Sequence, residues 1–487
     1  MKFKTIFQSA FYLLFATASF GQDSINKSTA PKIFLEFAVL DLPYLKDAAQ
    51  AFSNHRQGEG MDCNCKRSLG DYIKSYSSPS MDQSIQMTKN LYGTVGYFTE
   101  LGTRKLFRAD KSKGRKLLSK VSGEIASLFT TSYLMAAPFG QAWVHEEFHR
   151  NVLSSNKIYS VDDVWKFKGG TTIAVSNVLD QDLINFKRMS PQDHIRMSAA
   201  GIEGEIQFAR NYQMGHFFKD LNTPLSGPYL LFSLGAVGYI SSTNEKEELD
   251  EELRKMNNKE FTIRERDFTG HDIASWVYDL FNPFQPFQSR GVHPTGIGID
   301  RYINPKNDFT DEMTKYADKM SRRSVLNLAS PSVIGVSKIK LKENVFFNLS
   351  LRHTLTSFGD DRQVDLLYKD LSNRMLVSYH NYSNKAENFS GVELQTVDKK
   401  VNVFSKEASL NLKVMYWNQP EKLLFEDVKG KSGGALELQI IPNINKWYKP
   451  YLEIEAKTKG WLAGNTYQNA MFGFKVGFKS LITQSQN

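Results

Sequence analysis

The sequence has little cysteine, no long hydrophobic run beyond its first residues and no block of charge of one sign. Only Cys63 and Cys65 occur among 487 residues, which excludes a disulfide-rich scaffold. The mean hydropathy of -0.40 argues against a polytopic helical membrane protein. The net charge of +9 is spread along the chain, so nucleic acid is not an expected partner. The role of the C-x-C pair stays open between a local disulfide, a reduced pair and two metal ligands.

Apolar and aromatic side chains are abundant in this sequence. The composition is 41% hydrophobic and 13% aromatic, with 34 Phe and 21 Tyr. Such a chain buries a large core, forms a barrel with aromatic girdles, or does both. The length suggests two or three domains, or one domain with a large extension.

The first residues predict a secretory signal peptide over residues 1–21. Lys2 and Lys4 make a basic start, residues 6–20 form a short apolar run, and Gly21 precedes a polar segment. The run is too short for a comfortable membrane span. We therefore expect an exported protein, located in the periplasm or the outer membrane.

The hydrophobic pattern changes once along the chain, which predicts an α+β protein with two parts. Residues 24–325 show helical spacing and are expected to form a mainly helical domain. Ser190 and Pro191 supply a cap and a first residue for a long helix that then presents Gly201 and Gly204. These small residues predict the close approach of a partner helix.

Residues 330–487 alternate with a period of two and are expected to form an antiparallel β domain. Phe472, Phe474 and Val476 alternate with Gly473 and Lys475, and several candidate strands approach ten residues. One architecture is an outer-membrane barrel with its apolar face toward lipid. The other is a soluble sandwich or barrel whose apolar faces meet.

One motif carries chemistry: His145-Glu146-Glu147-Phe148-His149, an H-E-x-x-H sequence. On a helix, positions i and i+4 lie on one face, so both imidazoles can reach a single Zn²⁺ ion. Glu146 would lie beside the open coordination position, where it can take a proton from metal-bound water and return it to the leaving group. The motif therefore predicts Glu146 as the catalytic residue and His145 and His149 as metal ligands.

The third zinc ligand is expected on the helix that begins near Ser190. H-E-x-x-H followed by Glu203-Gly204 on a later helix resembles the gluzincin group of zinc metallopeptidases. The resemblance implies that residues 24–325 form a zincin-like domain, that Glu203 is the third ligand, and that the chain hydrolyses a peptide or protein substrate. It covers the two motifs alone, and Ile202 stands where the family usually has Asn. Glu205 is the alternative ligand, because it lies four residues after Gly201 on the small-residue face.

Two further segments are dense in groups that could stabilise an oxyanion, residues 268–272 and 290–302. Their candidate side chains are His271, His293, Arg301 and Tyr302. Two other functions stay open beside the peptidase. One is an outer-membrane β-barrel or binding protein with a structural or degenerate zinc site. The other is a zinc-assisted hydrolase of a lipid or a cell-wall amide.

Overall fold

The computed structural model describes most of the chain after the predicted signal peptide. The described residues are 32–57, 67–166, 173–257, 262–403, 406–445 and 447–483. Residues 1–21 and the pair Cys63 and Cys65 lie outside these ranges, so the predictions made for them are not addressed by the structure.

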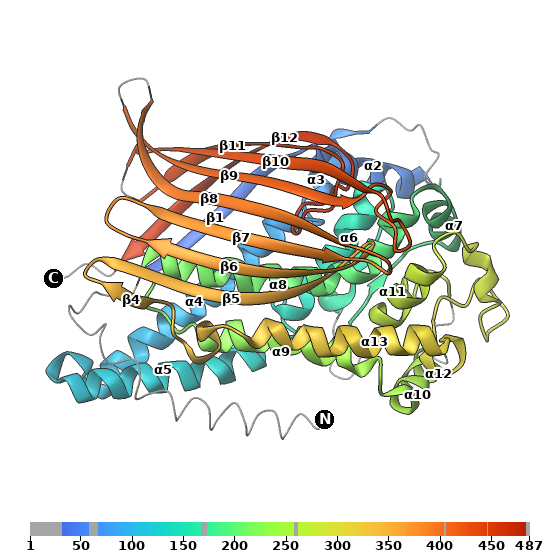
Figure 1. The fold of residues 1–487 in the computed structure, drawn as a ribbon, viewed down its shortest axis with the longest axis horizontal. Helices are drawn as coiled ribbons and strands as arrows, with labels where there is room; N and C mark the ends of the chain where they lie inside the picture. The colour runs from blue at the N-terminus through green and yellow to red at the C-terminus, as the bar shows by residue number, and fades with distance from the viewer. Residues whose placement is uncertain are drawn as a thin grey trace.

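The protein is an α+β structure, as the sequence predicts, and its helices and strands form two layers (Figure 1). One layer is a ten-stranded antiparallel sheet in the order β1-β12-β11-β10-β9-β8-β7-β6-β5-β4. Its strands are β1 (Lys32–Leu42), β4 (Ile339–Lys342), β5 (Val345–Thr356), β6 (Gly359–Lys369), β7 (Arg374–Ser383), β8 (Asn388–Val403), β9 (Lys406–Pro420), β10 (Gly430–Pro442), β11 (Lys449–Lys457) and β12 (Met471–Thr483). A separate small sheet pairs β2 (Val161–Asp162) with β3 (Val175–Ser176).

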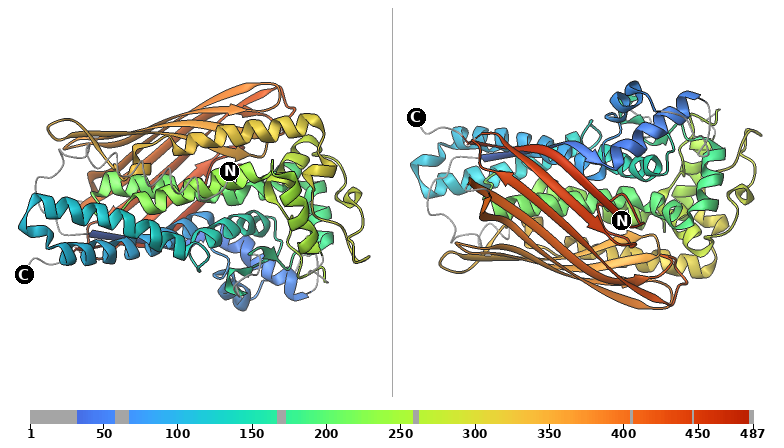
Figure 2. Two further views of the ribbon diagram at one scale, coloured as in Figure 1. Left: turned by 90° about the horizontal axis from the view of Figure 1, so that it is seen from below. Right: turned by 90° about the horizontal axis from the view of Figure 1, so that it is seen from above.

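The second layer is helical and lies along one face of the large sheet (Figure 2). Its α-helices are α2 (Tyr44–Gln57), α3 (Leu69–Ser75), α4 (Met81–Phe107), α5 (Lys113–Leu134), α6 (Gln141–Ser155), α7 (Asp180–Met189), α8 (Pro191–Lys219), α9 (Ser226–Ser242), α10 (Lys246–Asn257), α11 (Asp272–Phe281), α12 (Pro305–Asp308) and α13 (Asp311–Ser324). No helix in the described part of the chain is both long and apolar enough to cross a membrane.

The change from helices to strands falls between α13, which ends at Ser324, and β4, which begins at Ile339. One strand departs from that division: β1 lies near the start of the chain and pairs antiparallel with β12. Strands β1 and β4 are the two edges, so the described strands form an open sheet. The closed barrel considered from the sequence is not confirmed.

Helix α8 is the central helix and runs beneath the sheet. Its N-cap is Ser190 and its first residue is Pro191, as predicted. Gly201 and Gly204 face α6, and a Cβ at Gly204 would lie 2.8 Å from the Phe148 ring. The prediction that these glycines admit a partner helix is confirmed, and α6, which carries H-E-x-x-H, is that partner.

Candidate metal centre

The H-E-x-x-H motif lies on α6, as predicted, and its histidines are buried in the helical layer. His145 is 8% exposed and His149 is fully buried. The helix begins after a tight turn at its N-cap Gly140, where a Cβ would lie 2.1 Å from the carbonyl oxygen of Leu134. Glycine thus permits the turn that ends the preceding segment and directs α6 beneath α8.

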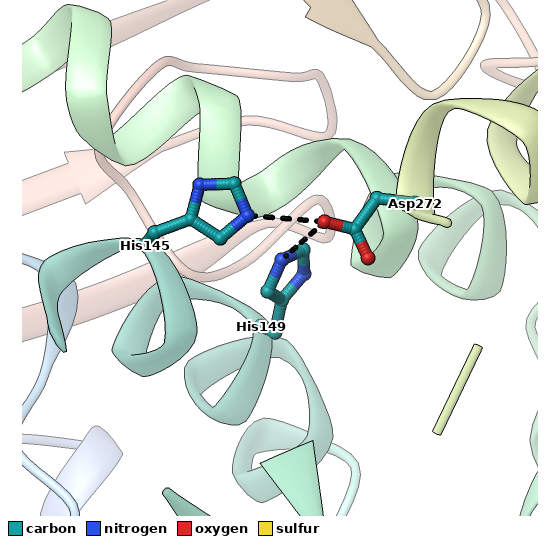
Figure 3. Close-up of side chains that lie close together, drawn as sticks. All are labelled: His145, His149 and Asp272. Atoms are coloured by element: carbon teal, nitrogen blue, oxygen red, sulfur yellow. Dashed lines mark hydrogen bonds and ion pairs between the residues drawn. The ribbon is translucent and has the colours of Figure 1, made fainter. Parts of the chain in front are cut away.

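A carboxylate from a distant segment meets both histidines. Asp272 is the first residue of α11, whose N-cap His271 accepts a hydrogen bond from the backbone N–H of Ala274. Asp272 Oδ2 lies 3.0 Å from His145 Nε2 and 3.2 Å from His149 Nε2 (Figure 3). In the described residues these three side chains form a buried group that could hold a metal ion.

The three candidate ligand atoms lie within 4.8 Å of one another, and the two distances to Asp272 are compatible with a shared small divalent cation. Zinc bonds of about 2.0–2.1 Å place neighbouring ligand atoms about 3.3 Å apart. The two Nε2–Oδ2 distances are close to that value. His149 Nε2 makes no well-aligned hydrogen bond, although it is buried. A buried imidazole nitrogen without such a bond is suited to donate its lone pair to a metal.

The opposite nitrogen of each ring is held by an acceptor. His145 Nδ1 lies 2.9 Å from Glu205 Oε1, and His149 Nδ1 lies 2.5 Å from the carbonyl oxygen of Met197. A proton on each Nδ1 satisfies these contacts, so each Nε2 could give its lone pair to a metal ion. A proton on His145 Nε2 can instead be donated to Asp272 Oδ2, which lies 3.0 Å away. Metal-bound histidines are commonly oriented in this way, by a carboxylate or a backbone carbonyl on the far nitrogen.

Gly201 lets the α8 backbone pack closely against both imidazoles. A Cβ at this position would lie 2.3 Å from His145 Nε2 and 2.5 Å from His149 Nε2. Any larger residue would therefore clash with the nitrogen atoms of the two proposed histidine ligands. The same helix carries Glu205, which contacts His145.

The site carries an excess of negative charge. Burial and the nearby charges of Asp272, Asp162 and Asp267 raise the pKa of Glu146 well above its usual range, although His145 opposes the shift. Burial would lower the pKa of His145, but its hydrogen bonds to Asp272 and Glu205 raise it well above the ordinary value. A divalent cation would compensate this concentration of carboxylates.

The two glutamates predicted as alternative third ligands, Glu203 and Glu205, make different contacts in the structure. Glu205 contacts His145 and accepts a 2.8 Å hydrogen bond from Gln141 Nε2, so it positions a ligand. Glu203 points elsewhere: it accepts hydrogen bonds from Arg196, at 2.7 and 3.2 Å, and from the backbone N–H of Gly464, at 2.8 Å. Glu203 therefore joins α8 to the loop between β11 and β12, and the histidines meet Asp272.

The sequence analysis identified the segment that contains Asp272 as polar but did not predict the Asp272 carboxylate as a metal ligand. Asp272 follows His149 by more than one hundred residues, so no spacing rule connects them. An acid at the first position of a helix also has an ordinary explanation, since it complements the helix dipole. The only sequence feature that pointed toward Asp272 was the density of polar groups in residues 268–272.

The other candidates from the two polar segments have different partners. Arg301 pairs with Asp180, His293 Nδ1 contacts the Thr295 hydroxyl, and the Tyr302 ring packs against Gly270. His271 lies beside the site, where its Nε2 contacts the Ser242 hydroxyl.

Tyr239 of α9 was not considered from the sequence, yet it borders the metal centre. Its ring stacks on His271 and lies 5.5 Å from the His145 ring, and its hydroxyl oxygen accepts a hydrogen bond from the Asp272 backbone N–H. Burial and the charge of Asp272 raise its pKa well above the ordinary value, so the phenol is neutral.

Comparison with known proteins yields no match: no protein-family model fits the chain, and no similar curated protein or solved structure is found. The function must therefore be argued from the site itself.

Proposed function

We propose that this protein is an exported zinc-dependent peptidase. The supporting observation is the convergence of His145 Nε2, His149 Nε2 and Asp272 Oδ2 next to Glu146. In this proposal Asp272 takes the place that the gluzincin resemblance gives to Glu203. The resemblance would then extend to the H-E-x-x-H helix alone.

In the proposed reaction, each residue around the ion would have a separate role. A zinc ion held here would supply a Lewis acid that acidifies water and polarises a carbonyl group. Glu146 would accept the proton of the attacking water and deliver it to the leaving nitrogen, as a general base that becomes a general acid. Glu205 and the Met197 carbonyl would keep the imidazoles oriented. Tyr239, as a neutral phenol at the edge of the site, is a candidate donor to the developing oxyanion.

A structural metal site is the second candidate, and the burial of the centre favours it. The proposed ligands and Glu146 are each at most 9% exposed. Catalytic zinc sites keep one coordination position open to water or substrate, whereas structural sites are closed. Zinc-assisted hydrolysis of a lipid or a cell-wall amide would use the same residues as the peptidase and differ in substrate.

Metal removal separates these functions. We expect 1,10-phenanthroline to abolish cleavage of a mixed peptide library, measured by mass spectrometry, and equimolar zinc to restore it. The control is 1,7-phenanthroline, which has a similar shape but does not chelate. Cleavage by the metal-free protein would contradict a zinc peptidase. A chain that binds zinc, loses thermal stability on chelation and cleaves no peptide would instead support the structural site.

A further inference from the structure

The face of the large sheet that points away from the helices is apolar and exposed. One row of paired residues crosses eight strands, from β5 to β12: Leu349, Leu366, Val377, Leu394, Val414, Leu436, Ala456 and Phe472. Apart from Ala456, these side chains are 43% to 69% exposed. The next outward row also holds mainly apolar residues: Phe347, Tyr368, Met375, Thr396, Leu412, Leu438, Ile454 and Phe474.

The face that points toward the helices is polar and buried. Its corresponding row begins with Ser350, Asp365, Ser378 and Glu393, each at most 2% exposed. Arg210 of α8 lies between the two acids, with Nε 3.2 Å from Asp365 Oδ2 and Nη2 2.9 Å from Glu393 Oε1. An antiparallel sheet in water normally has the reverse polarity, with its apolar face against the core.

Part of each side of the sheet is paired with amide side chains or backbone of the helical layer, on β1 and on β5. On β1, the backbone N–H and carbonyl of Glu36 are paired with the Asn90 side chain, at 3.0 and 2.8 Å. The N–H and carbonyl of Ala38 are paired with Gln86 and Gln83, at 2.6 and 2.9 Å. All three amides belong to α4, so this helix satisfies part of the edge as a neighbouring strand would.

At the other side of the sheet, backbone groups of β5 that are not paired with the short strand β4 are paired with the helical layer. The backbone N–H of Leu351 donates to the carbonyl of Ala329 at 3.0 Å. Asn327 binds both the N–H and the carbonyl of His353, at 2.9 and 3.0 Å. Unpaired backbone groups are tolerated in water but cost several kcal/mol each in hydrocarbon. Pairing of edge groups is therefore what a lipid-exposed open sheet requires.

Exposed apolar side chains also occur on α5, which lies at the opposite margin of the molecule from β11 (Figure 1). On α5, Leu117, Leu118 and Phe129 are 42% to 61% exposed. Exposed Lys113, Arg115 and Lys120 lie on the same helix. A second copy packed on the sheet would leave α5 uncovered, whereas lipid can cover a curved surface on several sides. The basic residues beside these apolar ones suit anionic headgroups.

We propose that the outward face of the sheet is a membrane-embedded surface that contacts lipid acyl chains. Contiguous apolar patches beyond a few hundred Å² are unusual on soluble monomers and mark interaction sites. The inverted polarity of the sheet, polar toward the helices and apolar outward, is the arrangement that lipid demands. This inference concerns where the protein resides and is independent of the proposed catalytic role.

Vesicle flotation tests the inference with a matched pair of substitutions. Val377→Arg places a charge in the middle of the outward row, and Val292→Arg places the same charge at an exposed site away from the sheet, where Val292 is 70% exposed. We expect the detergent-purified chain to insert into phosphatidylcholine vesicles on detergent removal and to float with them. Val377→Arg should lower the inserted fraction on the order of 100-fold, and Val292→Arg should leave it unchanged.

Four results would overturn the proposal. The first is a monodisperse monomer that needs no detergent and does not float. The second is equal flotation of both variants. The third is a detergent-free dimer that Val377→Arg converts to monomers, which would assign the surface to a second copy of the chain. Flotation that requires phosphatidylglycerol in the vesicles would also count against acyl-chain contact, because it would show headgroup binding alone. Circular dichroism in detergent checks that both variants fold.

Discussion

Glu146→Gln is expected to lower peptide hydrolysis by about 100- to 10,000-fold, the usual contribution of a general base, while zinc remains bound. Glutamine has nearly the shape of glutamate but cannot accept a proton at neutral pH. Glu146 makes no part of the His145, His149 and Asp272 group, so its replacement leaves the ligand atoms in place. The measurement is kcat/KM on a cleaved peptide together with zinc content by elemental analysis.

The control for this variant is Glu248→Gln, which makes the same chemical change at an exposed position of α10. It should leave both activity and zinc content at the wild-type level. Full activity in Glu146→Gln would contradict the proposed mechanism. Loss of zinc together with activity would show instead that Glu146 supports the site rather than the proton transfer.

Gly201→Ala is expected to weaken zinc binding, although alanine adds a single methyl group. The new Cβ would lie 2.3 Å from His145 Nε2, so the rings or the helix must move. Overpacking of this kind costs roughly 1–3 kcal/mol of stability. Because ligand geometry is disturbed as well, we expect zinc affinity to fall by at least about 10- to 100-fold. Competition with a chromogenic zinc chelator measures the affinity.

Gly215→Ala provides the matched control on the same helix. A Cβ there would meet only Leu221 Cδ1, at an ordinary 3.8 Å. Alanine is the better helix former, so this variant should keep zinc and gain about 0.5–1 kcal/mol in stability. If both alanine variants bind zinc as tightly as the wild type, α8 does not shape the site.

Local sequence signals predicted the helices that build the site. Ser190 and Pro191 determine the start of α8, and the i, i+4 spacing of His145 and His149 places both rings on one face of α6. The glycines of α8 identified its contact with α6. These features depend on neighbouring residues, which is why sequence reasoning reached them.

The long-range features could not be read in this way. Asp272 reaches the histidines because α11 begins beside α6, and nothing in its own neighbourhood distinguishes a ligand from a helix-terminal acid. Glu203 and Glu205 lie two positions apart on α8. The rotation of α8 about its axis determines that Glu203 contacts Arg196 and that Glu205 contacts His145. The alternation of the strands predicted a sheet with two unlike faces but not which of them is buried. The pairing of β1 with β12 joins opposite ends of the chain.

Zinc content distinguishes Asp272 from Glu203 as the third ligand. We would measure zinc by elemental analysis in the wild type, Asp272→Ala and Glu203→Gln after reconstitution with zinc. The account predicts about one zinc per chain in the wild type and in Glu203→Gln, with little or none in Asp272→Ala. Zinc that survives in Asp272→Ala but is lost in Glu203→Gln would contradict it, as would a wild type that binds no zinc.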